Sequence, residues 1–447
     1  NTIVMRHMTA DGSADVMATY NNGSSALVRN SVGTGTVYTF GPDLRDFGYR
    51  NMMNLDDNAH RSYSNGFEPT TDVFCFLLRN IIRNHTQNAV WKNPLPSNDP
   101  GTLMITHDVD SRTGMDSMYI FSDYEDTIGA TALYNITTRY INDTWMTNFY
   151  VGATAEINAL IDDGHIIASH SVGHFPDFDD ELIFPYGTTG NHPGTYQPMY
   201  TGGITTGGTV LGEVEVSKEL LEGDFNVPIR SWRSGHLAYH NLLPDGLEEL
   251  GYEFNSTFSA NDVLTSFPYY THLGRSFSGD ESKVLEIPMT ISDVFSSDPI
   301  SFSNYPSKVN KWIYATEKYV PNQSPINLLI HPNRFYKLQA MKDYLNAIDP
   351  SIVIRSMEEY GDFWKRRDSL SYTATLSGDT MQIQFSNTGL DLISIAIDAN
   401  GLDSVQFQDH LGNTLLYDTE PLMDSSTLYF NFERIPTGNA ELELPEV

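Results

Sequence analysis

The stretch Ile105-Thr106-His107-Asp108-Val109-Asp110 decides the fold, because it has the pattern of a buried strand that ends on two carboxylates. A second apolar stretch, Ala168-Ser169-His170-Ser171-Val172-Gly173-His174, ends on two histidines four positions apart. In parallel α/β barrels, such strand ends meet at one edge of the sheet and form the site. One carboxylate and two neutral imidazoles supply three ligands for a divalent metal and leave positions open for water and substrate. The two stretches together predict a hydrolytic metal site.

The segment from Thr102 to about Asp368 alternates short apolar strands with amphipathic helices, which is the pattern of a parallel sheet or barrel. The predicted strands are Leu103 to Thr106, Phe149 to Ala153, Ile166 to Ser169, Ile229 to Trp232, Val284 to Pro288, Asn327 to Ile330 and Ile352 to Arg355. The predicted helices are Glu156 to Asp163, Glu213 to Glu222, Leu243 to Leu250, Ser307 to Tyr319, Lys337 to Ala347 and Met357 to Arg366. The fold class is therefore α/β.

The sequence before this segment predicts a smaller accessory unit over residues 1–95. Residues 26–41 predict two strands around a Gly-x-Gly turn, and Val73 to Asn84 predicts an amphipathic helix. This arrangement resembles the closing portion of a glutamine-amidotransferase-like α/β domain, which implies a partial α/β domain ahead of the barrel. The Pro- and Asn-rich stretch from Lys92 to Pro100 is expected to be a linker to the barrel, residues 96–368.

The sequence after Ser369 changes to a period of two, as in Met381-Gln382-Ile383-Gln384-Phe385 and Ile393-Ser394-Ile395-Ala396-Ile397. This alternation without helices predicts a small β-sandwich over residues 369–447, with a core of its own. Such a domain either binds sugar or packs against the barrel.

The composition restricts the partners of the chain. Its 447 residues include 57 acidic and 26 basic side chains, a net charge of −31. Such a surface repels nucleic acid and anionic lipid, so a neutral polymer or a cationic product is more compatible. Adaptation to saline water explains the same charge equally well. No apolar run is long enough to span a membrane, and we expect a soluble protein. The one cysteine, Cys75, forms no disulfide and is expected to be a buried thiol.

Alternative interpretations exist for each candidate residue. The chain has a second His-x-x-x-His pair, His236 and His240, for which a structural or supporting role is expected. We prefer His170 and His174 as ligands because they follow directly on a buried strand, although surface histidines would give the same spacing. Two carboxylates as close as Asp108 and Asp110 repel each other unless a cation or a proton lies between them, but a solvated acidic turn is also possible. His331 ends a buried strand, and the unperturbed pKa of a histidine lies near neutral pH, which suits a general acid.

Five ordered pieces between about residues 100 and 365 resemble the motifs of polysaccharide deacetylases of the NodB-homology group, carbohydrate esterase family 4. They are Thr106-His107-Asp108-Val109-Asp110, His170-Ser171-Val172-Gly173-His174, Trp232-Arg233-Ser234-Gly235, Leu285-Glu286-Ile287-Pro288 and Leu329-Ile330-His331. The resemblance implies an irregular (β/α) barrel of the NodB type that uses a divalent metal, with Zn²⁺ expected. It implies Asp110, His170 and His174 as metal ligands, Asp108 as catalytic base, Arg233 as the residue that orients the base, and His331 as catalytic acid.

The chain departs from the family pattern in three places. Asp108 and Asp110 are separated by Val109 where many members have adjacent Asp residues, so base and ligand can be exchanged between them. Ser234-Gly235 replaces the usual Pro after the Arg. No Asp-x-Trp motif occurs near Asn255 to Phe258, which leaves the partner of His331 and the apolar wall for the acetyl group unassigned.

The resemblance implies a secreted or cell-surface hydrolase that removes N-acetyl groups from a polysaccharide. Its partner would be an N-acetylated glycan, without nucleic acid and without a membrane span, and nothing in the sequence indicates the oligomeric state. A second hypothesis is a catalytically weak surface or matrix protein that keeps the barrel for glycan binding or assembly. A third is a hydrolase of a small non-sugar amide.

Overall fold

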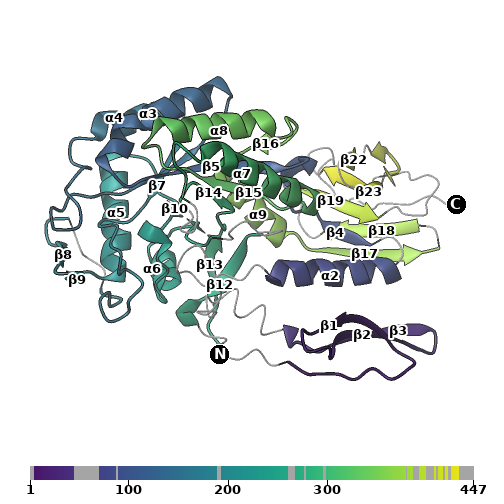
Figure 1. Ribbon diagram of the computed structural model, residues 1–447. Coiled ribbons are helices and arrows are strands. Elements are labelled where there is room, and N and C mark those ends of the chain that lie inside the picture. Colours follow the sequence, from purple (N-terminus) through teal and green to yellow (C-terminus); the bar gives the residue numbers. More distant parts are fainter. Residues whose placement is uncertain are drawn as a thin grey trace.

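The centre of the molecule is a curled, mostly parallel sheet of ten strands (Figure 1). The computed structural model describes residues 5–44, 70–86, 89–188, 193–259, 267–275, 278–294, 299–378, 380–385, 392–398, 407–408, 411–415, 418–420 and 424–431. The strand order is β12-β13-β11-β10-β7-β6-β5-β15-β14, with β16 beside β5. These strands are β5 (Thr102–Val109), β6 (Leu133–Ile136), β7 (Ile166–Ser169), β10 (Ser231–Trp232), β11 (Phe254–Asn255), β12 (Tyr269–His272), β13 (Glu281–Glu286), β14 (Ile291–Ser292), β15 (Ile326–Leu329) and β16 (Val353–Ile354).

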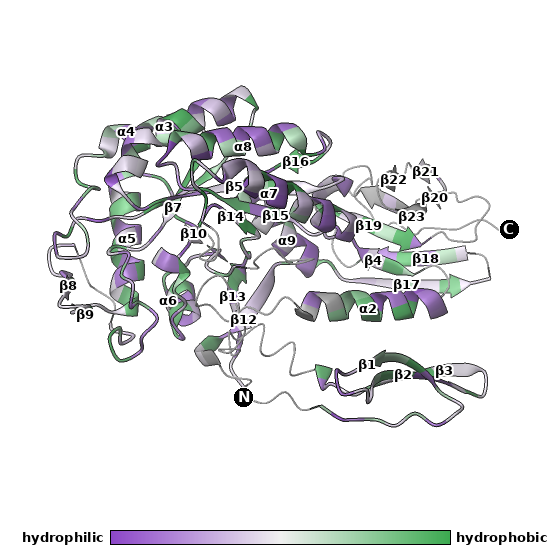
Figure 2. Ribbon diagram, viewed as in Figure 1, coloured by the Kyte–Doolittle hydropathy of each residue, from purple (hydrophilic) through white to green (hydrophobic). Residues whose placement is uncertain are grey.

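Seven helices of the described chain accompany this sheet: α3 (Arg112–Thr127), α4 (Thr154–Asp162), α5 (Val210–Phe225), α6 (Leu243–Glu249), α7 (Tyr305–Tyr319), α8 (Phe335–Ala347) and α9 (Met357–Ser369). They carry hydrophobic and hydrophilic residues on different sides (Figure 2). The predicted α/β half-barrel is therefore confirmed, and all six predicted helices are present. No helix among the described residues is long and apolar enough to cross a membrane.

The predicted strand over Phe149 to Ala153 is wrong. The amides of Phe149 and Tyr150 both donate to the carbonyl of Arg139, at 3.2 and 3.1 Å, so this apolar stretch closes a loop instead of joining the sheet. The sequence analysis also missed β6, which pairs parallel with β5 and β7. Helix α3 was also missed, although Ser111 caps it by accepting the amide hydrogen of Gly114.

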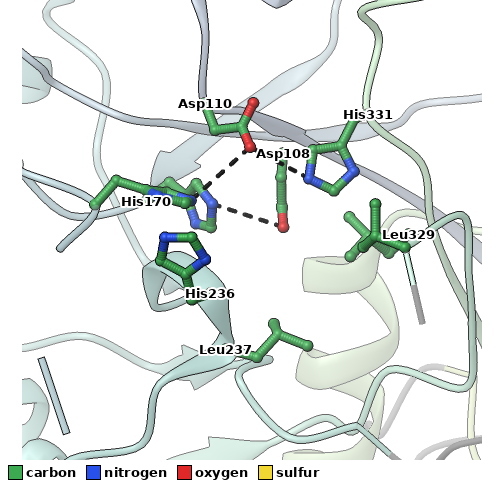
Figure 3. Close-up of a pocket in the computed structure, with 9 residues that line it drawn as sticks. Asp108, Asp110, His170, His236, Leu237, Leu329 and His331 are labelled. Atoms are coloured by element: carbon green, nitrogen blue, oxygen red, sulfur yellow. Dashed lines mark ion pairs between the residues drawn. The ribbon is translucent and has the colours of Figure 1, made fainter. Parts of the chain in front are cut away.

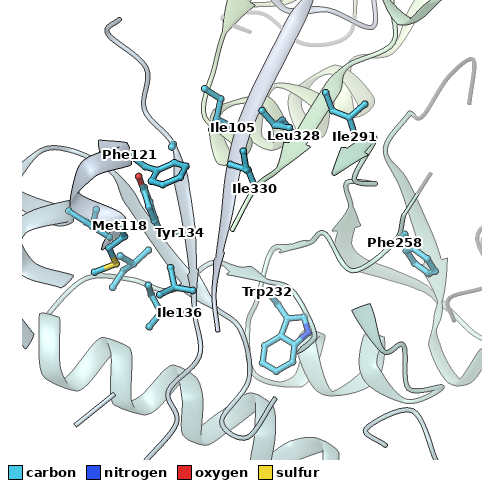
Figure 4. Close-up of a cluster of buried hydrophobic side chains, with 14 of the residues drawn as sticks. Ile105, Met118, Phe121, Tyr134, Ile136, Trp232, Phe258, Ile291, Leu328 and Ile330 are labelled. Carbon is cyan, nitrogen blue, oxygen red and sulfur yellow. The ribbon is translucent and has the colours of Figure 1, made fainter. Parts of the chain in front are cut away.

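The two faces of the sheet pack against different parts of the chain. On β5, alternate residues point to opposite sides, so Ile105 faces outward and Met104 faces inward. Helices α3 to α8 cover the outer face, where Ile105 packs with Leu328 and Ile330 (Figure 4). Helix α9 and the C-terminal strands cover the inner face. Thr106 and Asp108 follow Met104 at alternate positions of β5, so the side chain of Asp108 also lies on the inner face of the sheet.

The N-terminal part of the chain forms an antiparallel meander of β1 (Asp15–Thr19), β2 (Ser25–Val32) and β3 (Gly35–Phe40), followed by α2 (Thr70–His85). The two strands and the helix expected here are confirmed, whereas the resemblance to an amidotransferase-like domain stays a prediction. Cys75 is a free, exposed cysteine, so the expectation of a buried thiol is wrong.

The stretch expected to be a linker is packed into the protein. Strand β4 (Val90–Lys92) pairs antiparallel with β19 (Ser394–Asp398), and Leu95 is fully buried. The other C-terminal strands are β17 (Tyr372–Ser377), β18 (Thr380–Phe385), β20 (Phe407–Gln408), β21 (Thr414–Leu415), β22 (Asp418–Glu420) and β23 (Asp424–Asn431). One buried cluster contains Ile395 from this region, Tyr360 from α9 and Met104 from β5. The C-terminal strands thus share the core of the half-barrel, while the domain boundaries stay predictions.

This shared core gives a first testable prediction. Ile395→Ala removes a fully buried side chain that packs between the C-terminal strands and the sheet. We expect the free energy of unfolding to fall by about 2–5 kcal/mol, in a single transition that includes the barrel, as measured by denaturant unfolding. The control Leu376→Ala, at an exposed position, should cost less than about 0.5 kcal/mol. Two separate transitions would show that the C-terminal strands fold independently.

Candidate active site

Two carboxylates lie at the end of β5 and point into one pocket (Figure 3). Asp108 is buried, and its Oδ1 accepts hydrogen bonds from Arg233 Nη1 at 2.8 Å and from Asn135 Nδ2 at 2.9 Å. Burial alone would raise the pKa of Asp108, but Arg233, His170 and His331 outweigh it and lower the pKa. Asp108 is therefore an anion with one oxygen bound by the protein and the other, Oδ2, 3.6 Å from His170 Nε2.

Arg233 is fully buried at the end of β10 and joins several strands. Its Nη2 donates to Thr106 Oγ1 at 3.0 Å, and its Nε donates to Ser256 Oγ at 2.9 Å. Its carbonyl lies 2.8 Å from His170 Nδ1. Because a carbonyl only accepts, Nδ1 of His170 carries the hydrogen and Nε2 keeps its lone pair for the pocket.

The loop from His170 to His174 is held in a strained shape. Ser171 and His174 have positive φ angles of 67° and 49°, which side chains other than glycine rarely adopt. The buried carboxylate of Glu213 on α5 accepts the amide hydrogens of Val172 and Gly173, at 3.0 and 2.8 Å. Glu213 therefore fixes the middle of the loop and presents both imidazoles to the same pocket.

Both imidazoles are held in the neutral form. Burial lowers the pKa of His170, and burial together with the neighbouring His236 and His170 lowers the pKa of His174 well below its usual value. His174 Nε2 lies 3.9 Å from Asp110 Oδ2, which is too long for a hydrogen bond. Neutral imidazole is the form that binds a metal ion.

His331, which follows β15, faces the same pocket from the other side. Its Nε2 lies 3.5 Å from Asp110 Oδ2, and its Nδ1 is bonded to Asp293 Oδ1 at 2.9 Å. Burial disfavours the charged imidazole, but Asp293 and Asp110 outweigh burial and raise the pKa of His331 to about 9. Lys337 Nζ in turn binds Asp293 Oδ2 at 2.7 Å, and both partners keep the pKa of Asp293 well below its usual range. His331 is thus a protonated acid at neutral pH.

The second histidine pair is divided by the fold. His236 lines the pocket and packs edge-on against His174, with ring centroids 4.3 Å apart. His240 is buried elsewhere, where its Nδ1 accepts the amide hydrogen of Leu242 just before α6. The two do not form a ligand pair, which agrees with the supporting role expected for them.

The pocket has about 160 Å³ of space and two chemically different sides. The polar side consists of Asp108, Asp110, His170, His174, His236 and His331. The apolar side consists of Leu237, Val294 and Leu329. All six residues of the predicted site are thus brought together, five of them on the pocket wall and Arg233 behind Asp108.

The donor set suits a divalent metal. Two buried nitrogens, His170 Nε2 and His174 Nδ1, have no hydrogen-bond partner among the described residues, and a buried polar atom without a partner is costly. His170, His174 and Asp110 are the ligand types that Zn²⁺ prefers. In the described part of the chain, however, no three His, Cys, Asp or Glu side chains are close enough to form a preassembled metal site. The ligands fit by type and by protonation, and would have to close around the ion.

Several residues that complete the site were not found from the sequence. Asp293 follows the two-residue strand β14, and Glu213 lies in the first turn of α5, some forty positions from the loop that it binds. The apolar residues before Asp293 were the only local signal for it. Asn135, which binds Asp108, lies in β6, and Ser256, which binds Arg233, follows β11. The sequence analysis predicted neither strand.

The contacts of His331 give a second prediction. Asp293→Asn removes the main charge that stabilises the imidazolium, while burial continues to oppose it. The pKa of His331 should therefore fall from about 9 to its usual value of about 6.5 or below. An NMR titration of the His331 ring in metal-free protein measures this shift. Lys337→Met should move the pKa upward, and an unchanged pKa in Asp293→Asn would contradict the role of Asp293.

The chain was compared with protein families, with curated protein sequences and with solved structures, and only solved structures match it. No protein-family model and no curated protein sequence matches the chain. Among solved structures, a Mycobacterium smegmatis protein described as a polysaccharide deacetylase aligns over 65% of this chain and 98% of its own, with 15% identity and a TM-score of 0.43. The Xyl-CE4 domain of a multidomain xylanase from the hindgut metagenome of Trinervitermes trinervoides covers 60% of this chain and 91% of its own, with 14% identity and a TM-score of 0.34.

The catalytic domain of a peptidoglycan N-acetylglucosamine deacetylase from Eubacterium rectale covers 57% of this chain and 88% of its own, with 10% identity and a TM-score of 0.34. Similarity at this level carries no information about the activity of this chain. The curled, mostly parallel sheet and its helices agree with the irregular (β/α) barrel expected from the sequence motifs.

Proposed function

We propose that this chain is a metal-dependent deacetylase that removes N-acetyl groups from a polysaccharide outside the cell or at its surface. The observation that carries the proposal is the pocket itself. A buried carboxylate anion, a protonated histidine and two neutral histidines surround one small space that also has an apolar side. These are the groups that amide hydrolysis with a bound metal requires.

Asp108 is the proposed general base. Arg233 and Asn135 both bind its Oδ1, so the carboxylate keeps one orientation and Oδ2 faces the pocket. From there Oδ2 accepts a proton from the attacking water. A metal held by Asp110, His170 and His174, with Zn²⁺ as the expected ion, would supply Lewis-acid activation of that water and of the amide carbonyl. Asp110, partly exposed and close to His174 and His331, suits the ligand role better than the base role.

His331 is the proposed general acid. An amine leaves poorly as an anion, so C–N cleavage needs a proton on the nitrogen. Asp293 accepts the hydrogen of Nδ1, which orients the ring and directs Nε2 toward Asp110 and the pocket. The proton on Nε2 passes to the leaving nitrogen, and the products are a free amino sugar and acetate.

The apolar side of the pocket suits the methyl group of an acetyl substrate. Leu237, Val294 and Leu329 line the pocket beside the polar residues, and a space of about 160 Å³ suits a short acyl group. A net charge of −31 is compatible with a neutral N-acetylated polymer and with a product that becomes cationic. The same charge disfavours nucleic acid as a partner.

The second candidate function is glycan binding or assembly by a catalytically weak barrel at the cell surface. One observation favours it: the described residues contain no preassembled three-ligand metal site. Metal content and acetate release from an N-acetylglucosamine oligomer distinguish the two functions, because only the enzyme shows both.

A third prediction tests the metal ligands. His170→Ala and His174→Ala should each lose bound metal and acetate release while the fold survives, because an open catalytic site adds little to stability. Asp108→Asn should keep the metal and lose turnover by about 10²–10⁴-fold, as expected for loss of a base. Elemental analysis, circular dichroism and acetate release measure the three properties. Metal content equal to that of the wild type in both histidine variants would refute the ligand assignment.

A fourth prediction tests the acid. His331→Ala should lower the rate with an N-acetylated sugar by about 10²–10⁴-fold. The rate with an aryl acetate should fall much less, because its phenolate can leave without being protonated. In the wild type, the rate with the amide should fall above about pH 9 as His331 loses its proton. Equal losses with both substrates would mean that His331 supports the fold or the metal instead.

A further inference from the structure

A row of three aromatic rings continues outward from the pocket. The indole of Trp145 packs at a tilt against His236 on one side and against Tyr200 on the other, with ring centroids 5.5 Å apart in both cases. His236 also lines the pocket, so the row of Trp145, Tyr200 and His236 begins at the site. Tyr200 belongs to a hairpin of β8 (Met199–Thr201) and β9 (Ile204–Thr206), which lies beside α5 on the side of the barrel away from the C-terminal strands (Figure 1).

The aromatic row is fixed to the loop that carries the candidate metal ligands. The indole Nε1 of Trp145 donates to the carbonyl of His174 at 2.9 Å. Asp143 accepts the amide hydrogens of Trp145 and Tyr200, both at 2.9 Å. The fully buried Arg139 binds Asp143 and also the carbonyl of Gly173, at 2.9 Å, next to His174. The rings are therefore held in place before any ligand binds, which reduces the entropy lost on binding.

The rings of this row are available to a ligand. His236 is exposed, and Trp145 and Tyr200 are partly exposed. On the hairpin, Tyr200 and its cross-strand partner Thr205 face the body of the protein, while Ile204 is on the opposite face. Tyr200 thus points from the hairpin toward Trp145 and stays partly exposed at the end of the row.

We infer that the row of Trp145, Tyr200 and His236 is a binding subsite for a neutral pyranose ring next to the sugar that reacts. The face of a pyranose consists of C–H groups, and the negative face of an aromatic ring attracts such hydrogens. A contact of this kind needs no charge on the ligand, which agrees with the strongly acidic chain. The inference rests on the proposed function and makes it more specific, because a chain of sugars, but not a small amide, reaches this row.

The test compares a long and a short substrate in Tyr200→Ala. With an N-acetylglucosamine pentamer, we expect KM to rise about three- to tenfold more than it rises with an aryl acetate that fills only the pocket. Tyr200→Phe keeps the ring and should restore most of the affinity. Ile204→Ala, on the opposite face of the same hairpin, should behave as the wild type. Equal changes in KM with both substrates would overturn the inference.

Binding without turnover separates this inference from the proposed function. In the Asp108→Asn background, calorimetric titration with the pentamer should show the same three- to tenfold weakening on Tyr200→Ala. If the wild type releases no acetate but the pentamer still binds through Tyr200, the enzymatic proposal fails and the subsite stands. If acetate is released but Tyr200→Ala binds the pentamer as tightly as its parent, only the subsite fails. A change in oligomeric state of Tyr200→Ala, without a change in pentamer affinity, would instead identify the row as an interface between copies of the chain.

Discussion

The buried pair of Arg233 and Asp108 is the interaction on which the site depends. The side chain of Arg233 is fully buried and that of Asp108 is 3% exposed, and an unpaired charge at that depth would cost several kcal/mol. The guanidinium has bonds to Asp108, Thr106 and Ser256, which come from β5 and from the end of β11. Its backbone carbonyl fixes the ring of His170. The same residue therefore keeps the base ionised, holds the strands in register and selects the tautomer of a candidate ligand.

The sequence predicted those parts of the fold and site that depend on local pattern. Buried strands followed by polar residues placed Asp108, His170 and His331 at one sheet edge, as the structure shows. Prediction from the sequence failed where tertiary contacts override the local pattern. Phe149 is an example, because its amide donates to the carbonyl of Arg139 instead of joining the sheet. The sequence also could not identify Asp293, because the two-residue strand before it has no periodicity. It could not identify Glu213 either, because a Glu in a helix is usually solvated. The supporting residues come from remote segments, whereas the reacting residues form compact motifs.

Backbone strain is concentrated around the pocket. Positive φ angles occur at Ser171, His174, His236 and Leu237, between 49° and 67°. Each such residue costs roughly 1–3 kcal/mol, and the surrounding contacts must stabilise it. In the loop from His170 to His174, Glu213 accepts the amide hydrogen of Gly173 and Arg139 donates to the carbonyl of the same residue. These two contacts stabilise the loop. Gly235 packs so closely against His174 that a Cβ atom would lie 2.8 Å from its ring, so a larger residue at this position would displace the imidazole.

The pairing of β4 with β19 also determines the order in which the protein can fold. Lys92 and Ile395 are partners in this ladder, although nearly the whole half-barrel separates them along the chain. Contacts over such separations are slow to form, because a long loop must close before the ladder stabilises it. During synthesis, the cluster that contains Met104 and Leu285 stays incomplete until β19 has left the ribosome, because Ile395 and Ile397 belong to it. Until then the half-barrel exposes part of its apolar core, and such exposed surface favours aggregation.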